Sequence, residues 1–474
     1  MKFVKNIFFY LSMIAVFGAI IYYLLHSGKS LEHISGAVLD FSPQTGQNTS
    51  FFPGAFKAHL KDSLPTLLLQ VVVIISFTQL LGTLFKKIGQ PAVIGETVAG
   101  IILGPSLLGL LFPGAFHFLF PPESMENLKF LSQIGLILFM FIVGTELDIQ
   151  LIRRQALEAL IISHASILIP YTLGIGLSFF IYNQYAAAHS TFFSFALFMG
   201  IAMSVTAFPV LARIMRDRGL IGTKLGMLAI TCAASDDVTA WCLLALLIAF
   251  IKSGSGASGL FTIGLVLFYA GIMLVPVRLL LKRILNHYQK QKIGYNTLVA
   301  VMFTMLLFSA YCTEVIGIHA LFGAFLAGVV MPKNDELRKR ITNRISDVTM
   351  VMLLPLFFVF TGLRTQAGLL AHGGLWITFV FILLVAVLGK FGGSTLAAKL
   401  MGQSWKDSLS IGALMNTRGL MELIVLNIGY DMGVLSPEIF SMMVLMALLT
   451  TIMTSPALRW MERMKAKSGS PALE

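Results

Sequence analysis

The stretch between Lys224 and Lys252 constrains the fold of this chain more than any other. It contains only two charged residues, Asp236 and Asp237, which are adjacent and lie near its middle. About 20 apolar residues span a bilayer core, so the stretch is typical of a transmembrane helix with two carboxyl groups at mid-depth. A charge at that depth costs roughly 2.5–3.5 kcal/mol on insertion scales, and such acids mark ion or proton paths. We therefore expect that Asp236 and Asp237 lie on an ion or proton path. The alternative is that they are structural residues whose carboxyl groups bond to neighbouring helices.

The rest of the chain has the composition of a polytopic membrane protein. Of its 474 residues, 57% are hydrophobic and only 12% are charged, which excludes an ordinary soluble domain. Besides an N-terminal segment near residues 5–25, hydropathy predicts thirteen apolar segments. They lie near residues 63–85, 91–112, 127–146, 155–183, 190–214, 221–251, 257–282, 294–313, 316–331, 346–363, 372–400, 406–430 and 436–459. We therefore predict an all-α polytopic membrane protein with thirteen core helices and one extra N-terminal helix.

The net charge of +12 reflects membrane topology and not nucleic acid binding. If the segments cross alternately from a cytoplasmic N-terminus, most of the 34 Lys and Arg residues fall at cytoplasmic loops or helix ends, as the positive-inside rule requires. The exceptions are Lys29, Lys57, Lys61, Lys129, Lys252 and Arg364 on the opposite side, and Lys390 and Arg418 within the membrane. This predicted topology places both termini in the cytoplasm. The expected surroundings of the chain are the lipid bilayer, and no nucleic acid partner is expected.

The segment order divides the chain into four parts. Residues 1–25 are predicted to be an uncleaved membrane anchor, and a signal segment is the alternative. Residues 26–62, rich in polar groups, are predicted to form an extracytoplasmic loop, residues 63–459 the membrane domain, and residues 460–474 a short cytoplasmic tail. All three cysteines fall in predicted spans, so no disulfide framework is expected.

The segment at 190–214 contains a predicted helix break just before the Asp-Asp helix. Pro209 removes one backbone hydrogen bond and clashes with the carbonyl group of Val205. Freed carbonyl groups beside the hydroxyl group of Thr206 can coordinate a dehydrated cation, as broken helices do in transporters. An ordinary proline kink is the alternative. Ser235, directly before the two acids, is a further candidate ligand.

Lys390 lies deep in the segment at 372–400, too far from its cytoplasmic end for easy snorkelling. An unpaired ammonium group at that depth is unfavourable, so a carboxylate partner is expected. Asp236 and Asp237 are the acids available at that depth. A snorkelling lysine without a partner is the alternative.

The segment at 406–430 contains a second predicted break. Its middle carries four polar or flexible residues, namely Asn416, Thr417, Arg418 and Gly419. Arg418 and Glu422 are one helical turn apart and can pair on one helix face. A structural ion pair that braces the break is the first interpretation, and direct contact of these side chains with an ion is the second.

The order of these features is consistent with an inverted repeat. The core segments divide into six, a single segment at 257–282, and six more, and an offset of seven spans reverses membrane orientation. The fifth segment of each six contains a predicted break. We therefore predict two inverted six-helix repeats, on element order alone.

The sequence resembles the monovalent cation:proton antiporters of the sodium/hydrogen exchanger superfamily. It is most similar to the branch that contains the plant cation/proton exchangers and their bacterial relatives. The resemblance covers about residues 63–459 and rests on residues 202–213, the Asp-Asp helix, Gly389-Lys390 and residues 415–423. Residues 97–105 are similar to the early glycine motif of this family.

The resemblance implies a dimerisation domain, a mobile transport domain and two broken helices that cross. It also implies that Asp237 binds a cation and a proton alternately and that Lys390 pairs with Asp236. The position of Asp236 is aspartate in electrogenic members and asparagine in many electroneutral ones. The plant branch typically has Asn-Asp here, so the ion and the stoichiometry stay open. A homodimer in a cell membrane, which we expect to be a bacterial plasma membrane, is implied as well.

We therefore predict a secondary active antiporter that exchanges Na⁺ or K⁺ for protons by alternating access. The cation and the proton compete at Asp237, and Asp236 and Asp237 are predicted ligands of a monovalent cation only. No cofactor and no enzymatic activity are expected. The alternatives are a sodium-coupled small-solute symporter with the same helix arrangement and a potassium efflux channel-like protein, although no filter of repeated carbonyl loops is visible.

Overall fold

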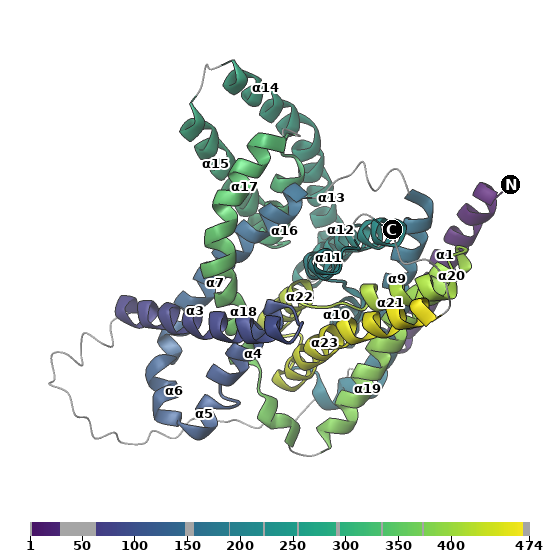
Figure 1. Cartoon of the computed structure of the whole chain (residues 1–474), viewed down its shortest axis with the longest axis horizontal. Helices are drawn as coiled ribbons and strands as arrows, with labels where there is room; N and C mark the ends of the chain where they lie inside the picture. Colours follow the sequence, from purple (N-terminus) through teal and green to yellow (C-terminus); the bar gives the residue numbers. More distant parts are fainter. Residues whose placement is uncertain are drawn as a thin grey trace.

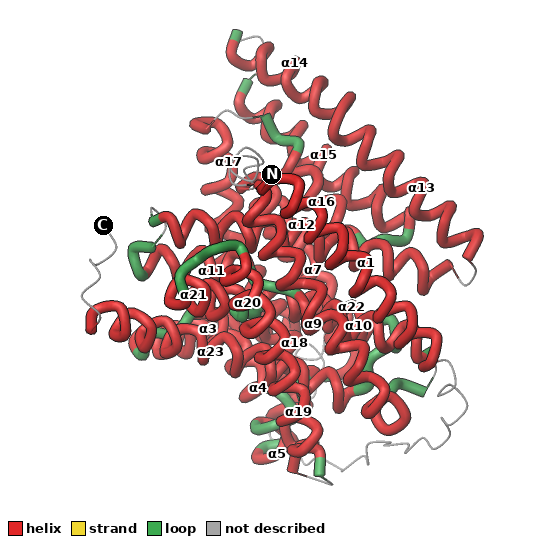
Figure 2. Tube along the Cα trace, turned by 90° about the vertical axis from the view of Figure 1, so that its right-hand side faces the viewer, coloured by secondary structure: helices red, strands yellow, loops and turns green. Residues whose placement is uncertain are grey.

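The computed structural model describes most of the chain and is almost entirely helical (Figure 2). The described residues are 2–28, 63–146, 156–188, 190–220, 223–253, 256–290, 294–332, 335–371 and 374–467. Their only strand-like pairing is an isolated bridge between Ala186 and Leu435. Most of the predicted loop at 26–62 and the end of the predicted tail at 460–474 lie outside the described residues.

The number of membrane-spanning helices is close to the prediction. Among the described residues, eleven helices are long and apolar enough to cross a membrane, or twelve if the bent pair α21 (Trp405–Met415) and α22 (Leu420–Asp431) is one span. The predicted segment at 316–331 corresponds to α16 (Ala320–Val329), which is too short to qualify alone. The all-α multi-pass fold is therefore confirmed. The count of thirteen and the inverted repeat stay predictions.

One set of helices, called here the first set, packs around α7 and α18. Within it, α4 contacts α3 and α18, α7 contacts α16 and α18, and α15 contacts α16. Figure 1 shows α14, α15 and α17 at its upper left end. Its elements are α3 (Ser63–Lys87), α4 (Ala92–Leu103), α5 (Leu108–Leu111), α6 (Pro113–Leu119), α7 (Pro122–Glu146), α13 (Gly256–Ile272), η2 (Met273–Val277), α14 (Arg278–Gln289), α15 (Tyr295–Ile316), α16 (Ala320–Val329), α17 (Asp335–Val348), η3 (Thr349–Leu353) and α18 (Leu354–Arg364).

Another set, called here the second set, packs around α9. This helix contacts α1, α10, α12, α19 and α20, while α23 contacts α19, α21 and α22. Figure 1 shows α19, α20 and α21 on its right side. The elements are α1 (Lys2–Gly28), α9 (Ala156–Tyr185), α10 (Phe192–Ser204), α11 (Phe208–Asp217), α12 (Lys224–Ser253), η4 (Ala367–Ala371), α19 (Leu375–Val387), η5 (Leu388–Gly392), α20 (Gly393–Leu400), α21 (Trp405–Met415), α22 (Leu420–Asp431) and α23 (Pro437–Lys467).

Small residues let helices of the first set approach closely. A Cβ atom at Gly100 of α4 would come within 2.7 Å of the Val359 backbone in α18. In lipid, where tails are as apolar as leucine, such close backbone packing is a main source of helix association. The early glycine motif is therefore part of the contact between α4 and α18.

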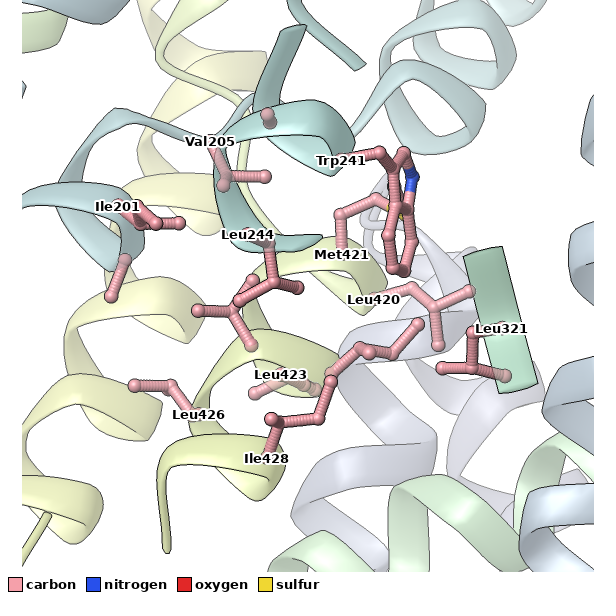
Figure 3. Close-up of a cluster of buried hydrophobic side chains, with 14 of the residues drawn as sticks. Ile201, Val205, Trp241, Leu244, Leu321, Leu420, Met421, Leu423, Leu426 and Ile428 are labelled. Atoms are coloured by element: carbon pink, nitrogen blue, oxygen red, sulfur yellow. The ribbon is translucent and has the colours of Figure 1, made fainter. Parts of the chain in front are cut away.

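A buried apolar cluster joins the two sets. Trp241 of α12 and Leu420 of α22, from the second set, lie beside Leu321 of α16, from the first (Figure 3). All three side chains are nearly inaccessible to solvent. The sets otherwise meet mainly where α12 packs on α13 and where α22 approaches α18.

Candidate functional site

Both predicted breaks are present, and they lie against each other. The helix α10 ends at Ser204 and α11 begins at Phe208, with Pro209 in the first turn, where its missing N–H does not interrupt the helix. The chain breaks again between Met415 and Leu420, with a bend of 42°. The Ala207 N–H donates to the Thr417 carbonyl group at 3.0 Å, so the two interrupted helices are joined at their breaks.

The two acids lie in the middle of α12 beside these breaks, and their surroundings differ. Asp236 is 0% exposed and Asp237 is 1% exposed. Because adjacent helical residues point about 100° apart, their carboxyl groups meet different neighbours.

Asp236 has a complete set of partners. The hydroxyl groups of Ser163 and Ser166 on α9 donate to its Oδ1 and Oδ2 atoms at 2.6 and 3.1 Å. The Thr206 hydroxyl group lies 2.8 Å from Oδ2 and 3.1 Å from the Met415 carbonyl oxygen. The Lys390 ammonium group pairs with Oδ2 at 2.8 Å. Asp236 is thus fixed by α9, by the first break and by a counter-charge.

Lys390 is fully buried and also fully paired. It lies in η5, a π-helical turn of the kind often found at functional sites. Its ammonium group, which has three N–H donors, reaches Asp236, the Ser166 carbonyl oxygen at 3.0 Å and the Ser204 carbonyl oxygen. The last of these is an end carbonyl of α10, so Lys390 also satisfies the helix end created by the break.

Asp237, in contrast, is nearly bare. Neither carboxylate oxygen has a hydrogen bond of normal geometry to the described residues. The backbone N–H of Phe208, at the start of α11, is the backbone group that interacts with it. An isolated buried carboxylate is unfavourable unless it is neutralised. Asp237 is therefore the acid of the pair without a compensating partner among the described residues.

Arg418 and Glu422 have the contacts of a brace. The Arg418 guanidinium group donates to the Ala202 and Met203 carbonyl groups at 2.8 and 2.6 Å, in the last turn of α10. It lies 3.3 Å from the Glu422 carboxylate, and both side chains are fully buried. The second break is thereby attached to the end of α10, in line with the first interpretation.

The remaining predicted residues lie around the two breaks. The Val205 N–H donates to the Ile201 carbonyl group, and the Thr417 hydroxyl group donates to that of Thr454. Asn416 is buried, and its Oδ1 atom has no hydrogen bond to the described residues. Within the described part of the chain, the Ser235 hydroxyl group contacts neither carboxylate, although its carbonyl group accepts from Thr239.

Sequence reasoning missed the serines of α9. Ser163 and Ser166 are separated by three positions, so they share one helix face, and both are buried against Asp236. Two hydroxyl groups at this spacing in an apolar segment were the available signal. Serine is common in membrane helices, however, so the signal does not single out this segment.

Gly419 is expected to be intolerant of a side chain. Its φ of +151° with ψ of −129° is a conformation nearly reserved for glycine. We predict that Gly419→Ala lowers the free energy of unfolding by about 1–3 kcal/mol, measured in mixed detergent micelles. Gly271→Ala is the matched control, because α13 is helical there and a Cβ atom meets nothing within 4 Å. Equal stability of the two variants would contradict the strained backbone at Gly419.

Interrupted helices that meet at a buried carboxylate pair, in a multi-pass helical bundle, define a secondary transporter of small cations. Residues 72–461 match the family described as the transmembrane sodium/hydrogen exchangers. The chain belongs to this family, and the resemblance found in the sequence is confirmed.

Relatives of known name are antiporters rather than enzymes. The chain is 43% identical to the Na⁺/H⁺ antiporter NhaS4 of Synechocystis sp., over 83% of this chain and 97% of that one. It is 40% identical to cation/H⁺ antiporter 17 of Arabidopsis thaliana, over 87% of this chain and 51% of the relative. For K⁺/H⁺ antiporter 1 of Saccharomyces cerevisiae the identity is 33%, over 85% and 47%. The chain therefore spans about half the length of these plant and yeast relatives.

The fold also matches a solved structure. The sodium proton antiporter MjNhaP1 from Methanocaldococcus jannaschii superposes with a TM-score of 0.62 over 87% of this chain and 99% of that one. At 17% identity, this similarity establishes the shared fold.

Proposed function

We propose that this chain exchanges a monovalent cation for protons, and that the two compete for the Asp237 carboxylate. The observation that carries the proposal is the contrast within the acid pair. Asp236 has four partners that include a lysine, whereas Asp237 is equally buried and has no hydrogen bond of normal geometry among the described residues. Within the pair, Asp237 is therefore the carboxylate left to bind a transported ion.

The difference between Asp236 and Asp237 explains how the movements of cation and proton would be coupled. With a proton or a monovalent cation bound, Asp237 is neutral and can move through a low-dielectric environment, whereas the bare carboxylate cannot. The second set, which carries α12 and both breaks, would then move against the first only when the site is loaded. Each reorientation carries one kind of ion in one direction, which makes the exchange obligatory.

Lys390 is a positioning residue in this scheme. Its charge compensates Asp236, so the pair adds no net charge of its own while the hydroxyl groups of α9 hold it in place. Arg418 and Glu422 keep the breaks together without contacting Asp237. Thr206 links the first break to Asp236 and so ties the chain just before α11 to the acid pair.

The finer organisation is also proposed. The basic loops favour cytoplasmic termini, and we propose a homodimer in a bacterial plasma membrane, as the sequence resemblance suggests. The four-part division into anchor, extracytoplasmic loop, membrane domain and tail rests on the sequence pattern. Relatives are named for both Na⁺ and K⁺, so both ions are candidates.

The test is dissipation of an imposed pH gradient in proteoliposomes. Addition of NaCl or KCl, but not choline chloride at the same ionic strength, is expected to collapse the gradient. The same assay under an imposed membrane potential separates electrogenic from electroneutral exchange. Collapse that requires an added organic solute would instead favour a sodium-coupled symporter, and no response to any cation would refute the proposal.

A further inference from the structure

A cluster of charged side chains joins the two helix sets at the end of α22. Asp431, the last residue of α22, pairs with Lys129 of α7 at 3.0 Å and with Arg364, the last residue of α18, at 2.8 Å. Both cations belong to the first set, whereas Asp431 belongs to the second. The ion pairs therefore connect the two sets directly. We call Lys129, Arg364 and Asp431 the latch.

Neutral groups reinforce the latch between α18 and α22. The Arg364 guanidinium group also donates to the Asn427 side chain at 3.1 Å, and the Asn427 amide donates to the Thr361 hydroxyl group at 2.8 Å. The guanidinium group lies over the rings of Phe360 and Tyr430, at 4.2 and 5.2 Å from their centroids. Arg364 is therefore held in one orientation, toward α22.

A small cavity lies directly beneath the latch. Its volume is about 30 Å³, which is room for about one or two water molecules. Lys129 and Asp431 of the latch line it, and Leu321, Ile424 and Ile428 are among its apolar lining residues. The cavity thus lies between the two sets and adjoins the Lys129–Asp431 ion pair.

An apolar layer separates this cavity from the acid pair. Trp241 lies one helical turn beyond Asp237 on α12, and it packs beside Leu420 and Leu321 (Figure 3). Leu420, Ile424 and Asp431 follow one another at helical spacing, so they share one face of α22. From the break to the end of α22, that face passes an apolar layer, a small cavity and a charged cluster.

We infer that the latch closes a gate on the path between Asp237 and the membrane surface at this end of α22, with Trp241, Leu321 and Leu420 as its seal. The inference rests on the proposed function, since a gate has meaning only for a transport site. Lys129 and Arg364 fall on the extracytoplasmic side in the predicted topology. The side chains of the latch are 17–30% exposed, and partly solvated pairs of this kind are individually weak. They can therefore hold the surface closed and still release it during each cycle.

The test measures access to the cavity and does not require transport. Ile424 is 1% exposed and lines the cavity, so an Ile424→Cys reporter is introduced after Cys232, Cys242 and Cys312 are replaced by Ala. A membrane-impermeant maleimide is then applied from the extracytoplasmic side. Asp431→Asn is expected to raise the labelling rate on the order of threefold to tenfold, because two weak pairs are lost together.

Three controls keep the test specific. The Lys129→Gln/Arg364→Gln double variant removes the same pairs from the other side, so the same rise is expected. Glu126→Gln removes an exposed charge from the same end of α7 outside the latch, and it should leave the rate unchanged. A Leu356→Cys reporter, in the apolar core of the first set, should stay unlabelled in every variant.

The outcomes separate the gate from general loosening and from the transport proposal. Unchanged labelling of the Ile424→Cys reporter in both latch variants would overturn the gate. A parallel rise at the Leu356→Cys reporter would overturn it too, because the whole bundle would then be loosened. Faster labelling in a protein that shows no cation-driven proton movement would support the gate and refute the antiport.

Discussion

The Asp237→Asn variant is expected to lose all cation-driven proton movement. Asparagine keeps the size of the side chain, but it neither takes up a proton nor carries the charge that attracts a cation. Competition at the site therefore ends, although the fold remains. The measurement is the initial rate of gradient collapse in proteoliposomes with equal amounts of protein, compared with empty liposomes.

The unfolding temperature of the Asp237→Asn variant gives a second measurement that does not depend on transport. An isolated buried carboxylate is unfavourable, so Asp237→Asn should unfold at the same or a higher temperature than the wild type. Thr239→Val is the matched control on the same helix, because among the described residues the Thr239 hydroxyl group bonds within α12, to the Ser235 carbonyl oxygen. That variant should retain exchange. Full exchange by Asp237→Asn would move the competing site to another group, with Asp236 as the first candidate.

The positions of the breaks were predictable because their causes are local. Pro209 cannot continue α10, and Gly419 supplies a backbone conformation that other residues avoid. Lys390 was identified for a similar reason, since an isolated charge in an apolar segment requires a partner. From the residues alone the choice of partner stayed open, and only the family resemblance pointed to Asp236. Whether Lys390 meets Asp236 or Asp237 depends on the rotation of α12, which is set by its packing on α9.

The family resemblance assigned different roles to the two acids, but the contacts that make them different could not be predicted from the residues. Ser163 and Ser166 turn Asp236 into a fully bonded group, and they come from a helix whose hydropathy is unremarkable. The carbonyl groups that receive Lys390 and Arg418 belong to the backbone, which carries no sequence signal. The contrast that supports Asp237 as the transport site therefore emerges only from the packed structure.

Hydropathy separates the segments at 294–313 and 316–331, but it misplaces the turn between them. Gly317 ends α15 with φ of +97°, and α16 begins only at Ala320, after His319 with φ of 87°. The predicted segment at 316–331 begins inside this turn, because hydropathy locates the ends of a helix only to within a few residues. For that reason α16 is shorter than the segment, and the helix count differs from the prediction.

Among the single variants considered, removal of the positive charge of Lys390 is expected to lower the free energy of unfolding most. In Lys390→Met, Asp236 stays buried with its charge uncompensated, and the Ser166 and Ser204 carbonyl groups lose a donor. Breaking one partner of a buried ion pair typically costs about 3–5 kcal/mol. We expect a decrease of that size in the free energy of unfolding, measured in mixed detergent micelles.

The double variant Lys390→Met/Asp236→Asn then tests the cause. If the loss comes from a stranded charge, removal of both charges should recover most of it, because a buried pair replaced as a whole is often close to neutral. Recovery should be incomplete, since two carbonyl groups still lack their donor. Lys399→Met is the control, because that lysine is only partly buried and donates to the Gln403 carbonyl group at 3.3 Å; its effect should stay within about 0.5 kcal/mol. A double variant as unstable as Lys390→Met would show that the hydrogen bonds to α9 and α10, and not the charge of Asp236, are what Lys390 provides.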